Sequence, residues 1–186
     1  SKKNIKAILA VHLYGHGIDI PALVKICRPF NALVIEDCAQ STGTKIFKKS
    51  SGTLAHAGTF SFFPTKNLPA LGDGGGVWVP TKKLQLKIES LRQYGWNQKR
   101  IVTLENGMNS RLDELQAAIL KIRLKDLNKD ILFRRKIADL YDLNLSDYFV
   151  RFSYPNYQVC SFHLYVVKVK HRTKLIQYMK QHDIFL

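Results

Sequence analysis

The sequence predicts an α/β fold in which helices flank a largely parallel sheet. Residues 7–13 and 32–36 are short apolar runs typical of buried strands, and segment 19–27 between them has apolar residues at helical spacing. A strand, a helix and a second strand in this order form a right-handed parallel crossover in nearly all proteins. Two further runs of strand-forming residues, 59–63 and 77–79, complete the expected sheet.

The remaining elements follow from helix signals and turn residues. Asp19 is expected to cap the first helix, Pro21 suits its first turn, and Pro29 ends it. The other expected elements are, in chain order, a polar loop at 41–57 with a short edge strand, an amphipathic helix at 84–91, an exposed loop at 96–107, a helix from a capping box at Ser110 and Asp113 to about Leu127, a basic helix at 129–143, an irregular stretch at 148–156, a strand at 162–169 and a helix at 173–181.

Composition limits the class of protein. The chain has 186 residues, of which 46% are hydrophobic, and no apolar run approaches the roughly 18 residues of a membrane span. The first residues are basic without an apolar stretch, so no signal peptide is expected. The three cysteines are widely spaced, which favours a reducing cytoplasm over a disulfide framework or a zinc site.

The net charge of +15 favours anionic partners. The basic residues are spread along the chain without a block or a nucleic-acid motif, so nucleic-acid binding is the weakest hypothesis. His12 and His16 have the spacing of a helical metal pair, but Gly15 and Gly17 argue against a helix there. A histidine with a structural role or a role in substrate binding is the preferred interpretation.

A candidate for covalent chemistry follows the run 59–63. Pro64 ends the strand, Lys66 comes next, and glycines recur over 72–76. This pattern places Lys66 on a tight connection beside an apolar strand, where partial desolvation would favour the free amine that a Schiff base requires. The alternative is an ordinary solvated lysine next to a glycine-rich turn.

An acidic pair ends the preceding strand, because 32–36 runs into Glu36 and Asp37. In open α/β sheets, ligands bind at the carboxyl ends of parallel strands. A strand that ends in aspartate, followed by a strand, a proline and a lysine, is the arrangement of pyridoxal phosphate (PLP) enzymes of fold type I. Taken alone, Asp37 could equally cap a turn.

Four motifs in order make the resemblance specific. They are Glu-Asp-Cys-Ala-Gln at 36–40, Ser-Phe-Phe-Pro-Thr-Lys-Asn-Leu at 61–68, Gly-Asp-Gly-Gly at 72–75 and Met-Asn-Ser-Arg-Leu-Asp-Glu-Leu-Gln-Ala-Ala at 108–118. Together they resemble the DegT/DnrJ/EryC1/StrS family of nucleotide-sugar aminotransferases. The resemblance implies fold type I, with part of the PLP-binding large domain and its mixed sheet at 1–127. A connecting helix and part of a small α+β domain are expected at 128–186.

The resemblance also implies roles for five residues. Lys66 matches the Schiff-base lysine, Asp37 the acid that pairs with the pyridine nitrogen, and Gln40 a residue near the ring hydroxyl. Ser61 matches a phosphate-binding serine, and Asn109 a residue that reaches the phosphate in the neighbouring subunit of a homodimer with shared active sites. Their alternatives are a surface glutamine for Gln40, a plain strand serine for Ser61 and a polar residue outside a helix cap for Asn109.

The resemblance implies a reaction in which an amino group is transferred, commonly from glutamate, to a keto-sugar nucleotide. The product would be used in the biosynthesis of lipopolysaccharide or other surface polysaccharides. Pro69 departs from the family pattern, which usually has glycine there, and the N-terminal part and C-terminal end of the family are not present in this sequence. The alternative is therefore a truncated, inactive remnant that only dimerises or binds anions.

Overall fold

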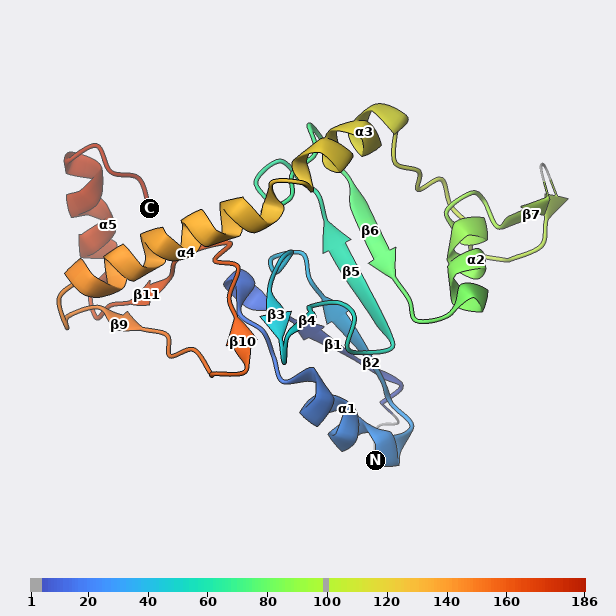
Figure 1. Ribbon diagram of the computed structural model, residues 1–186, viewed down its shortest axis with the longest axis horizontal. Helices are drawn as coiled ribbons and strands as arrows, with labels where there is room; N and C mark the ends of the chain where they lie inside the picture. Colours follow the sequence, from blue (N-terminus) through green and yellow to red (C-terminus); the bar gives the residue numbers. More distant parts are fainter. Residues whose placement is uncertain (1–4, 99–100) are drawn as a thin grey trace.

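A computed structural model of the protein describes residues 5–98 and 101–186, and it confirms the mixed α/β fold (Figure 1). The central sheet has the order β1-β2-β5-β6, formed by Ala7–Val11, Leu33–Asp37, Ala57–Ser61 and Gly75–Trp78. Strands β1, β2 and β5 are parallel, whereas β6 returns antiparallel to β5. The predicted basic start at residues 1–4, and residues 99–100 of the predicted loop, lie outside the described residues.

The predicted crossover from β1 to β2 is present. Helix α1 (Ile20–Cys27) begins where expected, because Asp19 Oδ1 accepts a hydrogen bond from the backbone N–H of Ala22 at 2.9 Å. The main core lies between this helix and one face of the sheet. It consists of the buried residues Ala10, Ile20, Cys27, Ala32, Val34 and Ile46.

The other elements extend to both sides of the sheet (Figure 1). The helices are α2 (Lys82–Leu91), α3 (Glu114–Arg123), α4 (Leu127–Asn144) and α5 (Arg172–Gln181). The short strands are β3 (Lys45–Ile46), β4 (Lys49–Ser50), β7 (Trp96–Gln98), β8 (Ile101–Val102), β9 (Val150–Arg151), β10 (Gln158–Val159) and β11 (Val167–Lys168). Strand β10 pairs with β3, so the C-terminal part of the chain returns to the sheet region. None of the described helices combines the length and the apolar character needed to cross a membrane.

Three local predictions are wrong. The helix expected from Ser110 begins only at Glu114, because the Ser110 N–H pairs with the carbonyl of Arg92 and holds that residue in an extended segment. The loop 96–107 contains the β7–β8 hairpin. The strand expected at 162–169 is reduced to β11, because Phe162 has a left-handed backbone (φ 44°) that interrupts an extended run.

The two faces of the sheet differ. On β2, Val34 and Glu36 are fully buried under α1 and the following loop, whereas Leu33 on the opposite face is 50% exposed. Two other strands of the sheet repeat the pattern, since Leu9 of β1 is 60% exposed and Val77 of β6 is also exposed. One face of the sheet therefore carries the core, and the other presents a row of open apolar side chains.

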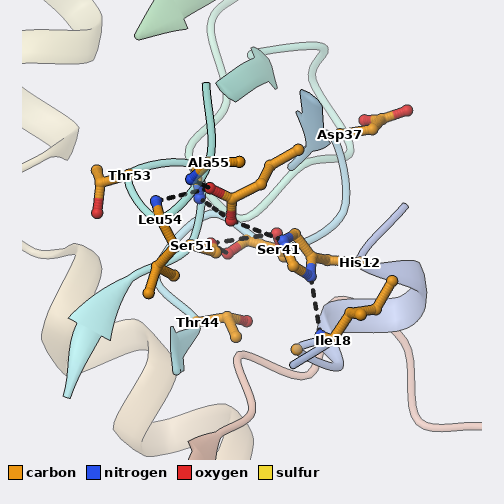
Figure 2. Close-up of polar contacts among 12 residues, drawn as sticks. His12, Ile18, Asp37, Ser41, Thr44, Ser51, Thr53, Leu54 and Ala55 are labelled. Atoms are coloured by element: carbon orange, nitrogen blue, oxygen red, sulfur yellow. Dashed lines mark hydrogen bonds and ion pairs between the residues drawn. The ribbon is translucent and has the colours of Figure 1, made fainter. Parts of the chain in front are cut away.

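Glu36 accepts hydrogen bonds from several segments on the covered face, and Figure 2 shows its partners His12, Leu54 and Ala55. Its Oε1 accepts hydrogen bonds from the N–H groups of Leu54 (2.7 Å) and Ala55 (2.9 Å), and its Oε2 accepts one from Gly52 (2.8 Å). His12 Nε2 lies 3.0 Å from the same Oε2. Because His12 Nδ1 accepts from the Ile18 N–H at 3.0 Å, the ring carries its hydrogen on Nε2 and donates it to Glu36.

The charge of Glu36 is maintained by these donors. Burial acts to raise the pKa of Glu36, but the hydrogen bonds from His12, Gly52 and Leu54 outweigh it and hold the pKa below the ordinary value. A depressed pKa means that the folded state favours the ionised carboxylate. Its contribution to stability is fully present above the unfolded carboxyl pKa of 4.5 and is lost as the pH falls through the lower folded value.

We expect Glu36→Gln to lower the free energy of unfolding by about 3 kcal/mol at neutral pH, because the amide offers one acceptor oxygen to four buried donors and turns its NH₂ group toward the others. The deficit relative to the unsubstituted protein should shrink at about pH 3.5, which lies below the unfolded pKa of 4.5, because the unfolded state then binds a proton that the folded carboxylate resists. Urea denaturation at both pH values measures this. Glu105→Gln, at an exposed acid, is the control, and an equal loss in both variants would contradict the assignment.

Candidate active site

Lys66 lies on a tightly held turn after β5. The turn closes when the Lys66 N–H donates to the Phe63 carbonyl at 2.9 Å. On the preceding side, Phe62 is bonded through its N–H to Gly74 (2.8 Å) and through its carbonyl to the N–H of Ala70 (2.7 Å). Leu68 and Ala70 are buried in a second core cluster with Leu120, Leu127 and Ile131 of the α3–α4 region. The half-buried Lys66 therefore extends from an anchored backbone.

Asn67 ties this turn to distant parts of the chain. Its buried side-chain amide donates to the carbonyl oxygens of Thr42 (3.4 Å) and Ser161 (3.1 Å). Local pattern reasoning gave Asn67 no role, because its partners lie 25 and 94 residues away. The position of Lys66 thus depends on contacts that only the folded chain supplies.

An open cavity of about 1400 Å³ adjoins the turn. Ser61 and Lys66 both line it, together with Gly74, Gly75 and Gly76 of the glycine-rich segment. A Cβ on Gly75 would lie 3.0 Å from the Phe60 carbonyl oxygen, so this wall has little room for a side chain. Residues of α2 and of segment 106–112 line it as well. Thr59 and Arg92, which sequence reasoning did not select, are also among the lining residues.

Asp37 lies on the open face of the sheet. It is paired in register with Thr59, and Ser61 follows two residues later, so alternation places all three on the same face. Its Oδ1 accepts from the Ala39 N–H at 2.9 Å. Figure 2 shows its carboxylate directed away from the His12–Glu36 cluster. Asp37 is not among the lining residues of the cavity itself, but it shares the surface that leads to Ser61.

Gln40 is oriented by the backbone. Its Oε1 accepts the N–H of Tyr14 at 2.8 Å, and a backbone N–H can only donate, so the amide oxygen must face Tyr14. The amide NH₂ is then the end available to a ligand. Tyr14 itself has a left-handed backbone (φ 61°), in the turn Leu13–Gly15.

Asn109 lies in an exposed extended segment that is bonded to residues 91–94. Its Oδ1 accepts from Arg111 Nε at 3.1 Å. Arg111 lines the cavity, whereas Asn109 does not. The structure therefore brings Ser61, Lys66 and Arg111 to one cavity, with Asn109 on the outer side of the segment.

A buried cluster on the other face of the sheet has residue types that bind metals, but their donor atoms are already used in hydrogen bonds. Donor atoms of His12, Glu36 and Cys38 lie within 4.8 Å of one another, and all three residues are buried. Both nitrogens of His12 and both oxygens of Glu36 are already engaged in hydrogen bonds. Burial raises the pKa of Cys38 to about 12, so it stays a thiol. The predicted structural role of His12 fits this geometry.

The comparison with known proteins decides the family. The profile of the DegT/DnrJ/EryC1/StrS aminotransferase family matches residues 2–185. The chain belongs to this family. Its fold agrees, since the X-ray structure of S. venezuelae DesV superposes with a TM-score of 0.92 at 34% identity, covering 96% of this chain and 48% of DesV. A family aminotransferase from Brucella abortus gives the same TM-score at 29% identity, with 97% and 48% covered. The fold is the type I PLP fold over half the length of these structures.

Curated relatives match most of this chain but only half of their own length or less. The chain is 42% identical over 180 residues to dTDP-3-amino-3,6-dideoxy-alpha-D-galactopyranose transaminase of Aneurinibacillus thermoaerophilus, covering 96% of this chain and 49% of the relative. It is 42% identical over 137 residues to a UDP-N-acetyl-3-dehydro-alpha-D-glucosamine 3-aminotransferase of Acidithiobacillus ferrooxidans, covering 73% and 37%. The chain spans about half the length of the curated relatives or less.

Asn67→Ala tests how the Lys66 turn is held. We expect it to lower the free energy of unfolding by about 2 kcal/mol, because two backbone carbonyls lose their donor in a buried setting. Urea denaturation of this variant and of the exposed control Asn156→Ala gives the comparison. If the two variants unfold at the same urea concentration, Asn67 does not anchor the turn.

Proposed function

We propose that the protein acts as a PLP-dependent nucleotide-sugar aminotransferase, with Lys66 as the residue that binds the cofactor covalently. The observation that carries the proposal is the placement of Lys66 and Ser61 on one cavity, on the sheet face that also bears Asp37. Membership of an aminotransferase family makes this arrangement meaningful, since the same residue types on another fold would have no such implication.

The residues present fit PLP. The cofactor needs an amine for its aldehyde, donors for its phosphate and an acid for its ring nitrogen, and Lys66, Ser61 and Asp37 are groups of these kinds. The glycine wall at 74–76 leaves backbone rather than side chains along the cavity. When bound, PLP supplies an electron sink that makes a C–H bond of the amino donor acidic.

The chain's own residues would divide the work. Asp37, steadied by the Ala39 N–H, presents a carboxylate that keeps the ring nitrogen protonated. Gln40 presents its NH₂ group, because Tyr14 holds the amide oxygen. Lys66 would hold the cofactor through its Nζ, and as a free amine the same Nζ would accept a proton and return it. The anchored turn limits how far Lys66 can move between these tasks.

The proposed acceptor is a nucleotide-linked keto-sugar, and the proposed donor is glutamate. Relatives are named as transaminases of dTDP- and UDP-linked sugars. Arg92 and Arg111 line the cavity and would suit a diphosphate, in a chain of net charge +15. We further propose a cytoplasmic homodimer in which Asn109, on the outer side of its segment, serves the neighbouring subunit. The product would supply lipopolysaccharide or another surface polysaccharide.

The alternative is a remnant that dimerises or binds anions without catalysis. The exposed apolar row of Leu9, Leu33 and Val77 on the site-bearing face favours this for the chain by itself, because further polypeptide would have to cover it in an enclosed active site. Cofactor attachment and sugar amination are therefore separate questions, and attachment is tested first.

PLP should attach to Lys66 in preference to the other lysines. We would incubate the chain with PLP, reduce the product with borohydride and locate the modified lysine by peptide mass mapping. Lys66→Met should abolish the principal site, because Lys66 is the only lysine of residues 5–98 and 101–186 that lines the cavity with Ser61. Lys49→Met, at an exposed lysine on β4, is the matched control and should leave labelling of Lys66 unchanged.

The same sample then tests transfer. Addition of glutamate before reduction should release 2-oxoglutarate and remove the labelling, and Asp37→Asn should slow this release more than it reduces attachment. Labelling spread evenly over exposed lysines, unchanged in Lys66→Met, would refute the proposal and favour the remnant.

A further inference from the structure

A second cavity lies between the residue that follows Lys66 and the junction of α3 and α4 (Figure 1). Its volume is about 330 Å³, which is the size of a site for a small molecule. Its lining residues are Asn67, Pro69, Arg123, Asp126, Lys129 and Asp130. None of these residues lines the larger cavity that contains Lys66 and Ser61, so the two cavities are separate.

Asn67 brings a buried amide oxygen without a partner to this cavity. The residue is only 8% exposed, and its Oδ1 receives no hydrogen bond from the described residues. The amide cannot be turned round, because its other end contacts the carbonyl oxygens of Thr42 and Ser161, which accept only from an NH₂ group. Neither of these two residues lines the cavity, so the oxygen is the end of the amide that is left for it. Pro69, two residues later, has no N–H to donate. A buried acceptor of this kind indicates a donor other than the described residues.

Four charged side chains surround the same cavity. Arg123 ends α3, and Asp126 immediately precedes α4. Lys129 and Asp130 lie in the first turn of α4, on the same face as Asp126, because residues three and four apart are neighbours on a helix. All four are exposed, and none forms an ion pair with any other residue that the structure describes. Acids at the start of a helix complement its dipole, but the dipole accounts for neither the two cations nor the unpaired amide oxygen.

We propose that this cavity binds a small zwitterion, namely a free α-amino acid. The ammonium group of the ligand donates to Asn67 Oδ1 and lies near the carboxylates of Asp126 and Asp130. The carboxylate of the ligand faces the cations of Arg123 and Lys129. The ligand thereby supplies the missing donor and pairs both kinds of charge.

The charge balance of the lining selects this class of ligand. Two cations and two carboxylates sum to zero, so a ligand that carries one sign of charge leaves half of the lining unmatched. Inorganic phosphate would meet the cations and be repelled by the acids, and a metal ion would be repelled by the cations. A molecule with both an ammonium and a carboxylate group matches the two halves together.

The proposed site goes beyond the aminotransferase reaction, since it requires neither the cofactor nor a role for Lys66. Its position still has a consequence for the larger cavity. Asn67 directly follows Lys66 and is already bonded to Thr42 and Ser161, so a ligand held by its Oδ1 would add another bond to the turn that carries the lysine.

Titration of the ¹⁵N-labelled chain with L-alanine, without cofactor and followed by NMR, tests this directly. The side-chain amide signals of Asn67 and the backbone amide signal of Lys129 should shift together and saturate. Propanoate and ethylamine are the matched analogues, because each keeps the size of L-alanine and lacks one of its charged groups. Each should bind about tenfold more weakly or worse, since a charge-assisted hydrogen bond is lost.

Substitutions within α4 separate the site from general effects of charge. Asp130→Asn and Lys129→Gln should each weaken the binding of L-alanine by about threefold, the scale of an exposed charge pair. Asp139→Asn and Lys136→Gln are the matched controls and should leave the affinity unchanged, because these exposed residues of the same helix do not line the cavity.

Two results would overturn the proposal. Signals that do not saturate, or an analogue that binds as tightly as L-alanine, would show that the cavity does not select a zwitterion, and would leave water as the partner of the Asn67 oxygen. An equal loss of affinity in the site variants and in their controls would show that binding follows only the net charge of α4. PLP attachment at Lys66 is measured separately, so failure of the zwitterion site and failure of the proposed function are distinguishable.

Discussion

A fully buried carboxylate is stable only where hydrogen-bond donors compensate for the water it has lost. Glu36 is fully buried, so the segments around it must supply these donors. Because its oxygens take the N–H groups of residues 52, 54 and 55, the loop after β4 has to curl over the end of β2. That path brings Gly52 so close to Phe60 and Gly58 that neither glycine can carry a side chain: a Cβ on Gly58 would lie 2.2 Å from the Gly52 carbonyl oxygen. The same carboxylate accepts from His12, whose other nitrogen holds the Ile18 N–H. The Glu36 carboxylate therefore determines the path of the loop after β4, the path of the chain before α1 and the need for glycine at positions 52 and 58.

The alternation of side chains along β2 separates Glu36 from Asp37, the acid proposed to pair with the cofactor ring. Glu36 and Asp37 are neighbours in sequence, yet their side chains lie on opposite faces of β2. A shift of the register by one residue would bury Asp37 and turn Glu36 to the open face. The bonds to Glu36 oppose such a shift, because every donor would lose its acceptor at once. The buried network therefore protects the orientation of Asp37 without touching it.

Elements that depend on interactions within a few residues were predicted correctly, whereas those that depend on distant segments were not. Helix α1 and strand β2 were predictable because Asp19, Pro21 and an apolar run act within a few residues. The helix start at Ser110 was predicted wrongly because Arg92, 18 positions earlier in the chain, competes for that residue's backbone. The strand at 162–169 failed for a similar reason: tertiary contacts hold Phe162 in a conformation that its local pattern does not favour. In the candidate site, Lys66 and Ser61 are marked by a motif, but Asn67 acquires its role only through partners in distant segments.

Long-range hydrogen bonds also connect the C-terminal part of the chain to the part that carries Lys66. The domain division predicted from the sequence falls at about residue 127, and the five residues proposed to bind the cofactor lie before it. Yet the carbonyl of Ser161 binds Asn67, its hydroxyl meets Thr44, and its N–H meets Gly15, so one residue beyond the division is bonded to three separate segments before it. Any displacement of the C-terminal part relative to the sheet would have to break these bonds together, because they converge on a single buried residue. The surroundings of Lys66 are consequently a property of the whole described fold, and the C-terminal part belongs to the candidate site as a structural component rather than as an attachment to it.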